Sequence, residues 1–310
     1  MLNKSTRVKK TILNRRDGNS KKNILTALGF LSPTLVIFCA FVLFPVFFSF
    51  YLSFHKWNMF SSGREFLGLE NYRRLFSDPE FWMVLKNTFI YTLGTVPLNM
   101  VIALLTAIIL NRRIAGKRFL RTAIFTPVVI SPVAAALIWR WIYDPNFGLL
   151  NYLMDLVGLP SVNWLNEPKA AMVALIIMGV WKTFGTNMVL FSAGLQGIPD
   201  HYYEAAEIDG AGWWSKFWNI TMPMLSPTTF FIMIMSMISS FQVFDIVYVL
   251  TSGGPLGATK VMVFYIYENA FKFFEMGYAS AAAYVFFAIL AVLTVLQVKF
   301  MQTRAGYEAV

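Results

Sequence analysis

Six long apolar stretches alternate with shorter polar and aromatic segments along the chain. They lie at roughly 25–54, 87–110, 122–142, 170–195, 220–250 and 278–298. A helix needs about 20 apolar residues to cross the hydrocarbon core of a bilayer, and each stretch is long enough. Because a backbone in lipid has to satisfy its own hydrogen bonds, we expect an all-α integral membrane protein with six transmembrane helices. An even number of spans places both termini on the same side.

The composition supports this interpretation. Of the 310 residues, 57% are hydrophobic and only 14% are charged, whereas charged residues make up about 25% of an average soluble domain. The first apolar stretch is longer than the core of a signal peptide, about 7 to 15 residues, and no small-residue cleavage site follows it. We therefore expect it to remain as a membrane anchor. Cys39, the single cysteine, lies within it, which excludes an intrachain disulfide.

Basic residues predict the orientation. Residues 1–24 hold eight Lys and Arg and the short segment 111–121 holds five; the N-terminal side has 16 in total and the other side nine. Since Lys and Arg accumulate in cytoplasmic loops, both termini are predicted to be cytoplasmic. The chain then divides into a basic tail (1–24), a six-helix transmembrane domain (25–298) and a second tail (299–310). The basic tail is typical of a solvated arm near anionic lipid, so we expect the bilayer, and no nucleic acid, as its partner.

Proline interrupts several of the predicted spans, at Pro33, Pro45, Pro97, Pro127 and Pro132 among others. Broken or kinked helices are tolerated in membranes where neighbours or water satisfy the freed backbone groups. Two alternatives would explain these prolines: a transport path through the helix bundle, or ordinary kinks in membrane helices.

Motifs of known catalytic chemistry are missing from the chain. It contains no H-E-x-x-H, no cysteine cluster, no G-x-S-x-G and no G-x-x-x-x-G-K-S/T. We therefore predict no catalytic residue, no metal site and no bound cofactor, and do not expect an enzyme. If the chain takes part in transport driven by ATP, ATP and Mg are used by another polypeptide.

The predicted cytoplasmic segment 198–219 is acidic in an otherwise basic protein. It carries four acids, Asp200, Glu204, Glu207 and Asp209, against Lys216 alone. "DHYYEAAEI" is compatible with a helix that Asp200 can cap, "DGAG" predicts a turn, and "WWSKFW" predicts a second amphipathic piece. We expect two short helices joined at a glycine bend, projecting from the membrane.

This segment resembles the cytoplasmic loop of binding-protein-dependent ABC importer permeases, in which E-A-A is followed by D-G-A and then by an apolar residue and proline. "FLGLENYRRLFSDPEFW", "GVWKTFGTNMVLFSAGLQGIP" and "TSGGP" resemble the sugar-transport branch, related to maltose and glycerol-phosphate permeases. The similarity extends from Leu25 to about Lys299. One departure is Met222, where the family often has leucine. The positions that the resemblance assigns to coupling with an ATPase are Tyr203, Glu204, Ala205, Ala206, Asp209, Gly210, Ala211 and Pro223.

The resemblance implies a transmembrane subunit that moves a sugar or sugar-like solute into the cytoplasm. Its partners would be a second permease subunit, usually a different chain, two ATPase subunits that use ATP and Mg, and an extracytoplasmic solute-binding protein. The location would be the cytoplasmic (inner) membrane of a bacterium or archaeon. The alternative is a secondary transporter driven by an ion gradient, with Lys182 and Asp245 as the ion-linked charges; it leaves the acidic loop unexplained.

Polar residues inside two spans mark a candidate substrate pathway. Lys182 lies near the middle of the fourth span, where a charge costs at least about 2.5 kcal/mol. It either pairs with Asp245, the only acid in the fifth span, or acts in gating or solute contact. Hydrogen bonding between helices is a competing explanation for each uncharged polar residue. The candidate residues are Lys182, Thr183, Thr186, Asn187, Gln242, Phe244, Asp245 and Tyr248.

Overall fold

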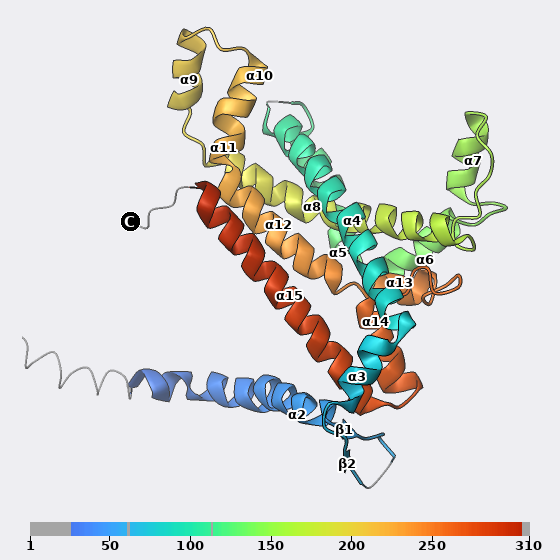
Figure 1. Cartoon of the computed structure of the whole chain (residues 1–310). Coiled ribbons are helices and arrows are strands. Elements are labelled where there is room, and N and C mark those ends of the chain that lie inside the picture. The colour runs from blue at the N-terminus through green and yellow to red at the C-terminus, as the bar shows by residue number, and fades with distance from the viewer. Residues whose placement is uncertain (1–25, 61–62, 113, 306–310) are drawn as a thin grey trace, which may run out of the picture.

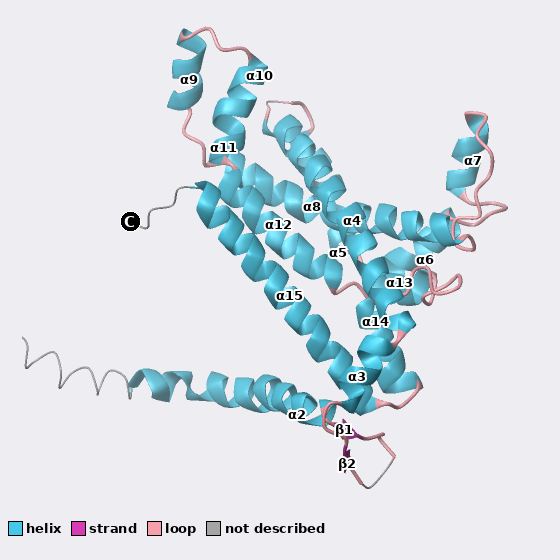
Figure 2. Cartoon of the chain, viewed as in Figure 1, coloured by secondary structure: helices cyan, strands magenta, loops and turns pink. Residues whose placement is uncertain are grey.

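The computed structural model describes residues 26–60, 63–112 and 114–305, and nearly all of their regular structure is helical (Figure 2). The predicted tail 1–24 and residues 306–310 lie outside the described residues. The long helices are the N-terminal helix Thr26–Ser53, which contains a π turn (Cys39–Leu43) and ends as α2 (Phe44–Ser53), together with α4 (Pro79–Asn111), α5 (Lys117–Val129), α6 (Pro132–Ile142), α8 (Pro168–Gln196), α12 (Ser226–Phe241) and α15 (Met276–Ala305). The shorter elements are β1 (His55–Lys56), β2 (Glu65–Phe66), α3 (Glu70–Ser77), α7 (Leu149–Leu156), α9 (His201–Ile208), α10 (Trp213–Lys216), a π turn (Phe217–Thr221), α11 (Met222–Met224), α13 (Asp245–Leu250), α14 (Met262–Tyr267) and a third π turn (Glu268–Lys272).

Five of the six predicted spans are confirmed as helices long and apolar enough to cross a membrane. They are Thr26–Ser53, Pro79–Asn111, Pro168–Gln196, Ser226–Leu250 and Met276–Lys299. The second begins at Pro79, eight residues earlier than the hydrophobic pattern indicated. The Asp78 side chain causes this early start, because it accepts a hydrogen bond from the backbone N–H of Glu80 at 2.8 Å and so caps the helix.

The third predicted span, over 122–142, is broken, which is one of the outcomes that its two prolines predicted. That segment is two helices, α5 and α6, whose axes differ by 101°. Proline disfavours the helical conformation in the residue before it, and Ser131, which precedes Pro132, has ψ of 136° and lies outside both helices. The span is therefore broken at residues 130–131, near its middle.

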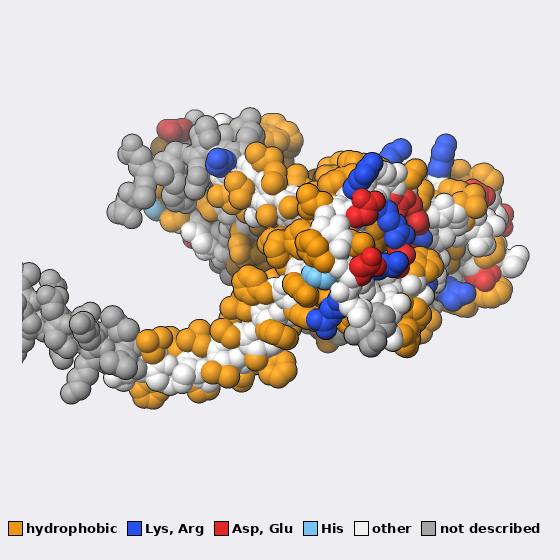
Figure 3. All heavy atoms as spheres, turned by 60° about the horizontal axis from the view of Figure 1, so that its bottom comes forward, with side chains coloured by type: hydrophobic (Ala, Val, Ile, Leu, Met, Phe, Trp, Pro, Cys, Tyr) orange, Lys and Arg blue, Asp and Glu red, His pale blue; other side chains and the backbone are white. Residues whose placement is uncertain are grey.

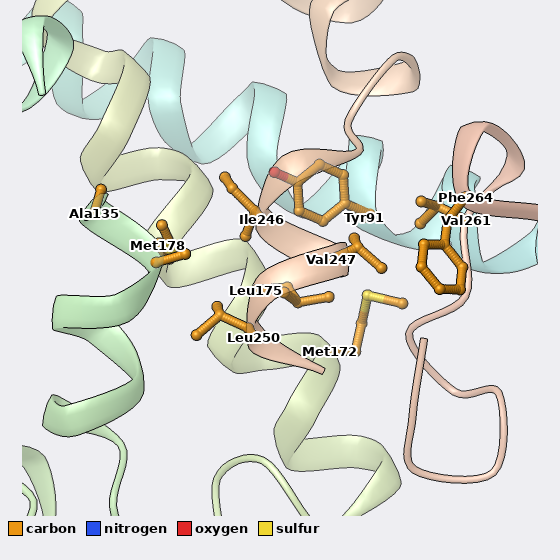
Figure 4. Close-up of a cluster of buried hydrophobic side chains, with 11 residues drawn as sticks. Tyr91, Ala135, Met172, Leu175, Met178, Ile246, Val247, Leu250, Val261 and Phe264 are labelled. Atoms are coloured by element: carbon orange, nitrogen blue, oxygen red, sulfur yellow. The ribbon is translucent and has the colours of Figure 1, made fainter. Parts of the chain in front are cut away.

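α8 is the central helix of the bundle and packs against α4, α5 and α12. Glycine allows the close approach to α4: a Cβ added to Gly179 would lie 2.3 Å from the Tyr91 hydroxyl. α8 also contributes Met172, Leu175 and Met178 to a buried hydrophobic cluster. Figure 4 shows these side chains pointing toward residues of α6 and α13, so the broken span and the end of the fifth span share one core.

The two ends of the molecule carry different structures. α9 and α10 project at one end, beside the connection between α4 and α5, whereas β1, β2 and α3 lie at the other (Figure 1). The N-terminal helix extends away from the bundle, and only 6% of its most apolar window is buried. Hydrophobic side chains cover this helix, while charged side chains gather at the end that carries β1 and β2 (Figure 3).

Charged and hydroxyl groups join the helices at that second end. The Lys260 ammonium lies 2.6 Å from Glu80 and 2.7 Å from Glu268. The Asp78 carboxylate accepts hydrogen bonds from the Tyr265 and Tyr278 hydroxyls at 2.7 and 3.0 Å. Burial raises the pKa of Asp78, but these hydrogen bonds and that of the Glu80 N–H outweigh it, and the net pKa is lowered. Asp78 therefore remains ionised and holds the start of α4 against α14 and α15.

Candidate transport cavity and coupling loop

A cavity of about 630 Å³ lies between α4, α5, α8 and α12. Seven of the eight residues proposed for the substrate pathway line it: Lys182, Thr183, Thr186, Asn187, Gln242, Phe244 and Asp245. Tyr248 does not line it. Its ring instead packs near Phe244 and Tyr267, at centroid distances of 5.5 and 5.7 Å.

Several polar residues of the cavity wall hydrogen-bond to one another across three helices. The Asn99 amide donates to the Thr183 hydroxyl at 2.7 Å. The Asn187 amide donates to the Asn99 side-chain oxygen at 2.6 Å and to the Ser236 hydroxyl at 2.9 Å. For Thr183 and Asn187, hydrogen bonding between helices, the alternative considered above, therefore accounts for the polar side chain.

The sequence analysis missed Asn99 and Ser236. The sequence feature that could have identified them is an amide or hydroxyl side chain within an otherwise apolar run. Such a polar group has to find a hydrogen-bond partner inside the bundle. By contrast, Gln242 and Asp245 line the cavity and are exposed. The polar groups best placed to meet a solute are therefore those of Gln242 and Asp245, with the apolar walls supplying the rest of the contact surface.

Lys182 does not pair with Asp245, so that hypothesis was wrong. Its ammonium donates to the backbone carbonyls of Pro127, Val128 and Ile130, at 2.8, 3.1 and 2.7 Å. These carbonyls belong to the end of α5 and the residue that follows it. Lys182 is therefore buried against the break in the third span.

The acidic segment forms the predicted helical hairpin. α9 ends in a Schellman motif: the Ala211 N–H donates to the Ala206 carbonyl at 2.8 Å, and the Gly210 N–H donates to the Glu207 carbonyl at 3.0 Å. Gly210 has a φ of +76°, which glycine adopts without the steric cost that a Cβ brings. Asp200 occupies the cap position of α9 as expected, but its side chain makes no capping hydrogen bond.

Two side-chain contacts hold the hairpin closed. The Lys216 ammonium of α10 lies 2.7 Å from the Glu207 carboxylate of α9. This hydrogen bond lowers the pKa of Glu207. The Tyr203 and Thr221 hydroxyls lie 3.0 Å apart at the base of the hairpin. Tyr203, Glu207 and Lys216 also line a groove that Asn111 and Arg112 complete at the end of α4.

The outer face of α9 is uncovered. Glu204 and Ala205 are exposed, and the Ile208 side chain is 88% exposed. The sequence analysis did not single out Ile208, although an apolar residue within an acidic helix was a usable signal. The face of α9 that carries Glu204, Ala205 and Ile208 is therefore open to solvent.

Comparison with known proteins identifies the family. The family described as "binding-protein-dependent transport system inner membrane component" matches residues 99–305, which include most of the cavity lining and the whole hairpin. The chain belongs to this family. It is therefore a multi-pass membrane permease and a transport component, not an enzyme.

Relatives of the permease have names that agree with this assignment. A probable ABC transporter permease of Bacillus subtilis, YesP, is 37% identical over 300 residues, which cover 95% of this chain and 96% of YesP. The trehalose/maltose transport system permease MalF of Thermococcus litoralis is 36% identical over 274 residues, covering 88% and 92% of the two chains. These relatives are ABC transporter permeases, and they give no support to the alternative of an ion-driven secondary transporter.

A solved structure supports the fold of the permease. A chain in the crystal structure of a bacterial alginate ABC transporter, in complex with an alginate-bound periplasmic protein, superposes with a TM-score of 0.80 at 22% identity. The match covers 94% of this chain and 99% of the other. The permease thus has the ABC transporter permease fold.

Proposed function

We propose that the permease carries a sugar or sugar-like solute into the cytoplasm and that a separate ATPase drives it through the α9–α10 hairpin. The observation that carries the proposal is a helical hairpin with an uncovered outer face at one end of a bundle that holds a cavity lined by apolar surface and several polar side chains. The coupling residues would be Tyr203, Glu204, Ala205, Ala206, Asp209, Gly210, Ala211 and Pro223, to which we add Ile208.

The cavity supports the solute class. Sugars need hydrogen-bonding groups together with apolar or aromatic surface, and the wall combines Thr186, Gln242 and Asp245 with Phe244 and Phe231. The trehalose and maltose named for the Thermococcus relative are solutes of this class. The cavity therefore fits a solute rich in hydroxyl groups.

The proposal includes an orientation and a division of the chain. With both termini in the cytoplasm, the tails 1–24 and 299–310 flank the transmembrane domain 25–298, and the coupling loop 198–219 also faces the cytoplasm. The basic segment 111–121 would then lie on the same side as the hairpin, in agreement with the positive-inside rule. The cell membrane would be that of a bacterium or an archaeon.

The proposed assembly contains a second permease subunit in the form of a different chain, two ATPase subunits that use ATP and Mg, and an extracytoplasmic binding protein. The periplasmic protein bound in the alginate transporter structure supports the last of these partners.

The ion-driven alternative needs Lys182 and Asp245 as charges that interact with the transported ion. All three donors of the Lys182 ammonium already bind backbone carbonyls, which argues against that role for Lys182.

Site-specific crosslinking tests the coupling. In a Cys39→Ser background, Ala205→Cys places one thiol on the exposed face of α9, and Leu69→Cys places one on an exposed residue, 68% accessible, at the opposite end. After crosslinking in native membranes, mass spectrometry identifies the attached protein. We expect an ATPase subunit from Ala205→Cys and not from Leu69→Cys. An ATPase attached to neither, or equally to both, would contradict the proposal.

A further inference from the structure

We propose that Lys182 is a positioning residue that fastens the break in the third span to α8, so that movement of the hairpin is passed to the cavity wall. This inference rests on the proposed function, because it describes how the same hairpin acts on the same cavity. It is carried by three observations: the carbonyls that Lys182 binds, the close contact of α8 with α5, and the path from α8 to the hairpin.

The break leaves backbone groups that need partners. The last four carbonyls of a helix have no N–H partner within that helix, and an unsatisfied carbonyl in the hydrocarbon region costs several kcal/mol. Pro132, which follows the break, has no N–H to offer. The partner for the end of α5 therefore has to come from another helix.

Lys182 supplies a partner for three carbonyls at this point. An ammonium group has three N–H donors, and those of Lys182 meet three carbonyl oxygens, of Pro127, Val128 and Ile130. A positive charge also interacts favourably with the negative end of a helix dipole. Because all three donors are used, Lys182 has none left for a solute. The residue acts on transport through the backbone that it holds.

Glycine brings the two helices close enough for this contact. A Cβ added to Gly185, three residues after Lys182, would lie 2.6 Å from the Ile124 carbonyl oxygen and 3.3 Å from the Phe125 Cα. Both neighbours are backbone atoms of α5, which cannot move aside as a side chain can. The backbone of α5 thus rests directly on α8, and the Lys182 side chain can reach the break.

The same helix leads to the hairpin. α8 ends at Gln196 and α9 begins at His201, so only four residues connect them. Within this connection Ile198 is buried in a cluster that also contains Leu195 and Leu225. A four-residue connection that is anchored by the buried Ile198 transmits displacement because it can stretch only a little. Movement of α9 is therefore passed to α8.

The break itself borders the cavity. Val128, before the break, and Pro132, after it, both line the cavity. On the far side of the break, the buried Ala135 and Ala136 of α6 lie in the same cluster as residues of α13, the helix that begins with Asp245. A shift of α8 would therefore carry the break and both adjoining parts of the wall. Chains of packed elements of this kind carry coupling between distant sites.

Two substitutions separate the role of the hydrogen bonds from that of volume. Lys182→Met keeps much of the side-chain length and removes all three donors, whereas Lys182→Arg keeps charge and donors. Each is tested in the assembled transporter with its ATPase and binding protein, reconstituted in liposomes. We expect Lys182→Met to lower solute uptake per ATP hydrolysed by about tenfold, a usual size for coupling between sites, and Lys182→Arg to restore most of it.

A distance measurement gives a readout that a loss of stability alone would not produce. The spin labels are placed at Val173 in α8 and Leu137 in α6, both exposed, in a Cys39→Ser background. The distance between the two labels reports whether α6, on the far side of the break, keeps its position relative to α8. With Lys182 present, we expect one narrow distance distribution that stays the same between the nucleotide-free and vanadate-trapped states. With Lys182→Met, we expect a broad distribution that differs between those states.

Gly185→Ala provides a second variant, because it should separate α5 from α8 and broaden the same distribution even if Lys182→Met fails to fold. An unchanged, narrow distribution in whichever of these variants folds, or normal uptake per ATP in Lys182→Met, would overturn the inference. The crosslinking experiment tests the proposed function separately: capture of the ATPase together with an unchanged distribution would reject only the role of Lys182.

Discussion

Two lysines, the buried Lys182 and the partly buried Lys260, show how the permease accommodates an ammonium group that is shielded from water. Lys182 donates to backbone carbonyls, whereas Lys260 lies between the carboxylates of Glu80 and Glu268. Burial lowers the pKa of Lys260, but the hydrogen bonds to Glu268 and Glu80 outweigh it and raise the net pKa. Lys260 therefore stays charged and joins the loop before α14 to the start of α4.

The pairing of Lys260 leads to a prediction about stability. The Glu268 side chain is only 11% exposed and also contacts Lys272, whose own side chain is 44% exposed. Lys260→Met would leave Glu268 with one exposed partner and should cost about 3 kcal/mol, near the low end for breaking a buried ion pair. Lys272→Met removes a surface partner and should cost less than about 1 kcal/mol. Thermal unfolding in detergent, followed by tryptophan fluorescence, compares the two, and equal shifts would disprove the difference.

At the level of the element, the α9–α10 hairpin owes its shape to a single backbone conformation. Gly210 allows the chain to leave α9 with positive φ, and the Glu207–Lys216 ion pair then closes α10 against α9. Nothing lies within 4 Å of a Cβ added at Gly210 or at Gly212, but Gly212 has an ordinary φ of −71°. These two glycines differ in backbone strain and not in available space.

This difference makes Gly212 a matched control for Gly210. We expect Gly210→Ala to destabilise the hairpin by about 1 to 2 kcal/mol, the cost of a left-handed conformation for a residue with a Cβ, and to reduce crosslinking from Ala205→Cys to the ATPase. Gly212→Ala should leave the crosslinking yield unchanged. Both variants should insert into the membrane normally. If both behaved as the parent chain, the strained turn would have no part in docking.

The elements could be predicted from sequence more fully than the site. Apolar runs of about 20 residues identify spans because lipid imposes that length, and the acidic segment with its glycine gave the hairpin. The break was marked by Pro127 and Pro132, but three of its carbonyls bind Lys182, 52 to 55 residues away, and a local pattern does not contain that contact. Seven of the eight residues predicted for the pathway line the cavity, yet most of the wall comes from other residues. The prediction failed at Tyr248, which lies three residues after Asp245 but packs near Phe244 and Tyr267 instead.

At the scale of the whole molecule, one helix organises the bundle. α8 contacts α4, α5 and α12, and a glycine lies at each contact: Gly179 faces Tyr91, Gly185 faces the backbone of α5, and Gly194 faces Thr228. Small residues let helices approach closely where no hydrophobic force drives them together, as in lipid. The N-terminal helix has no comparable contact along most of its described length and is largely exposed.

This arrangement predicts where glycine substitution is costly. Gly179→Ala would place a Cβ 2.3 Å from the Tyr91 hydroxyl, force α4 from α8, and cost about 1 to 3 kcal/mol, as overpacking usually does. Gly29→Ala in the N-terminal helix has open space around it and should be neutral or slightly stabilising, because alanine favours helices. Thermal unfolding of the two variants in detergent measures the contrast. Similar losses would show that α8 has no special place in the packing.

The break in the third span also has a consequence for biosynthesis. α5 and α6 have 13 and 11 residues, which amount to about 20 and 16 Å of helix, and each is shorter than the roughly 30 Å of hydrocarbon that a span has to cross. Lys182, which donates to three carbonyls at the end of α5 and at the break, comes later in the chain than both helices and is synthesised after them. These hydrogen bonds therefore cannot form until α8 has been made, so the third span is completed only with the help of the span that follows it.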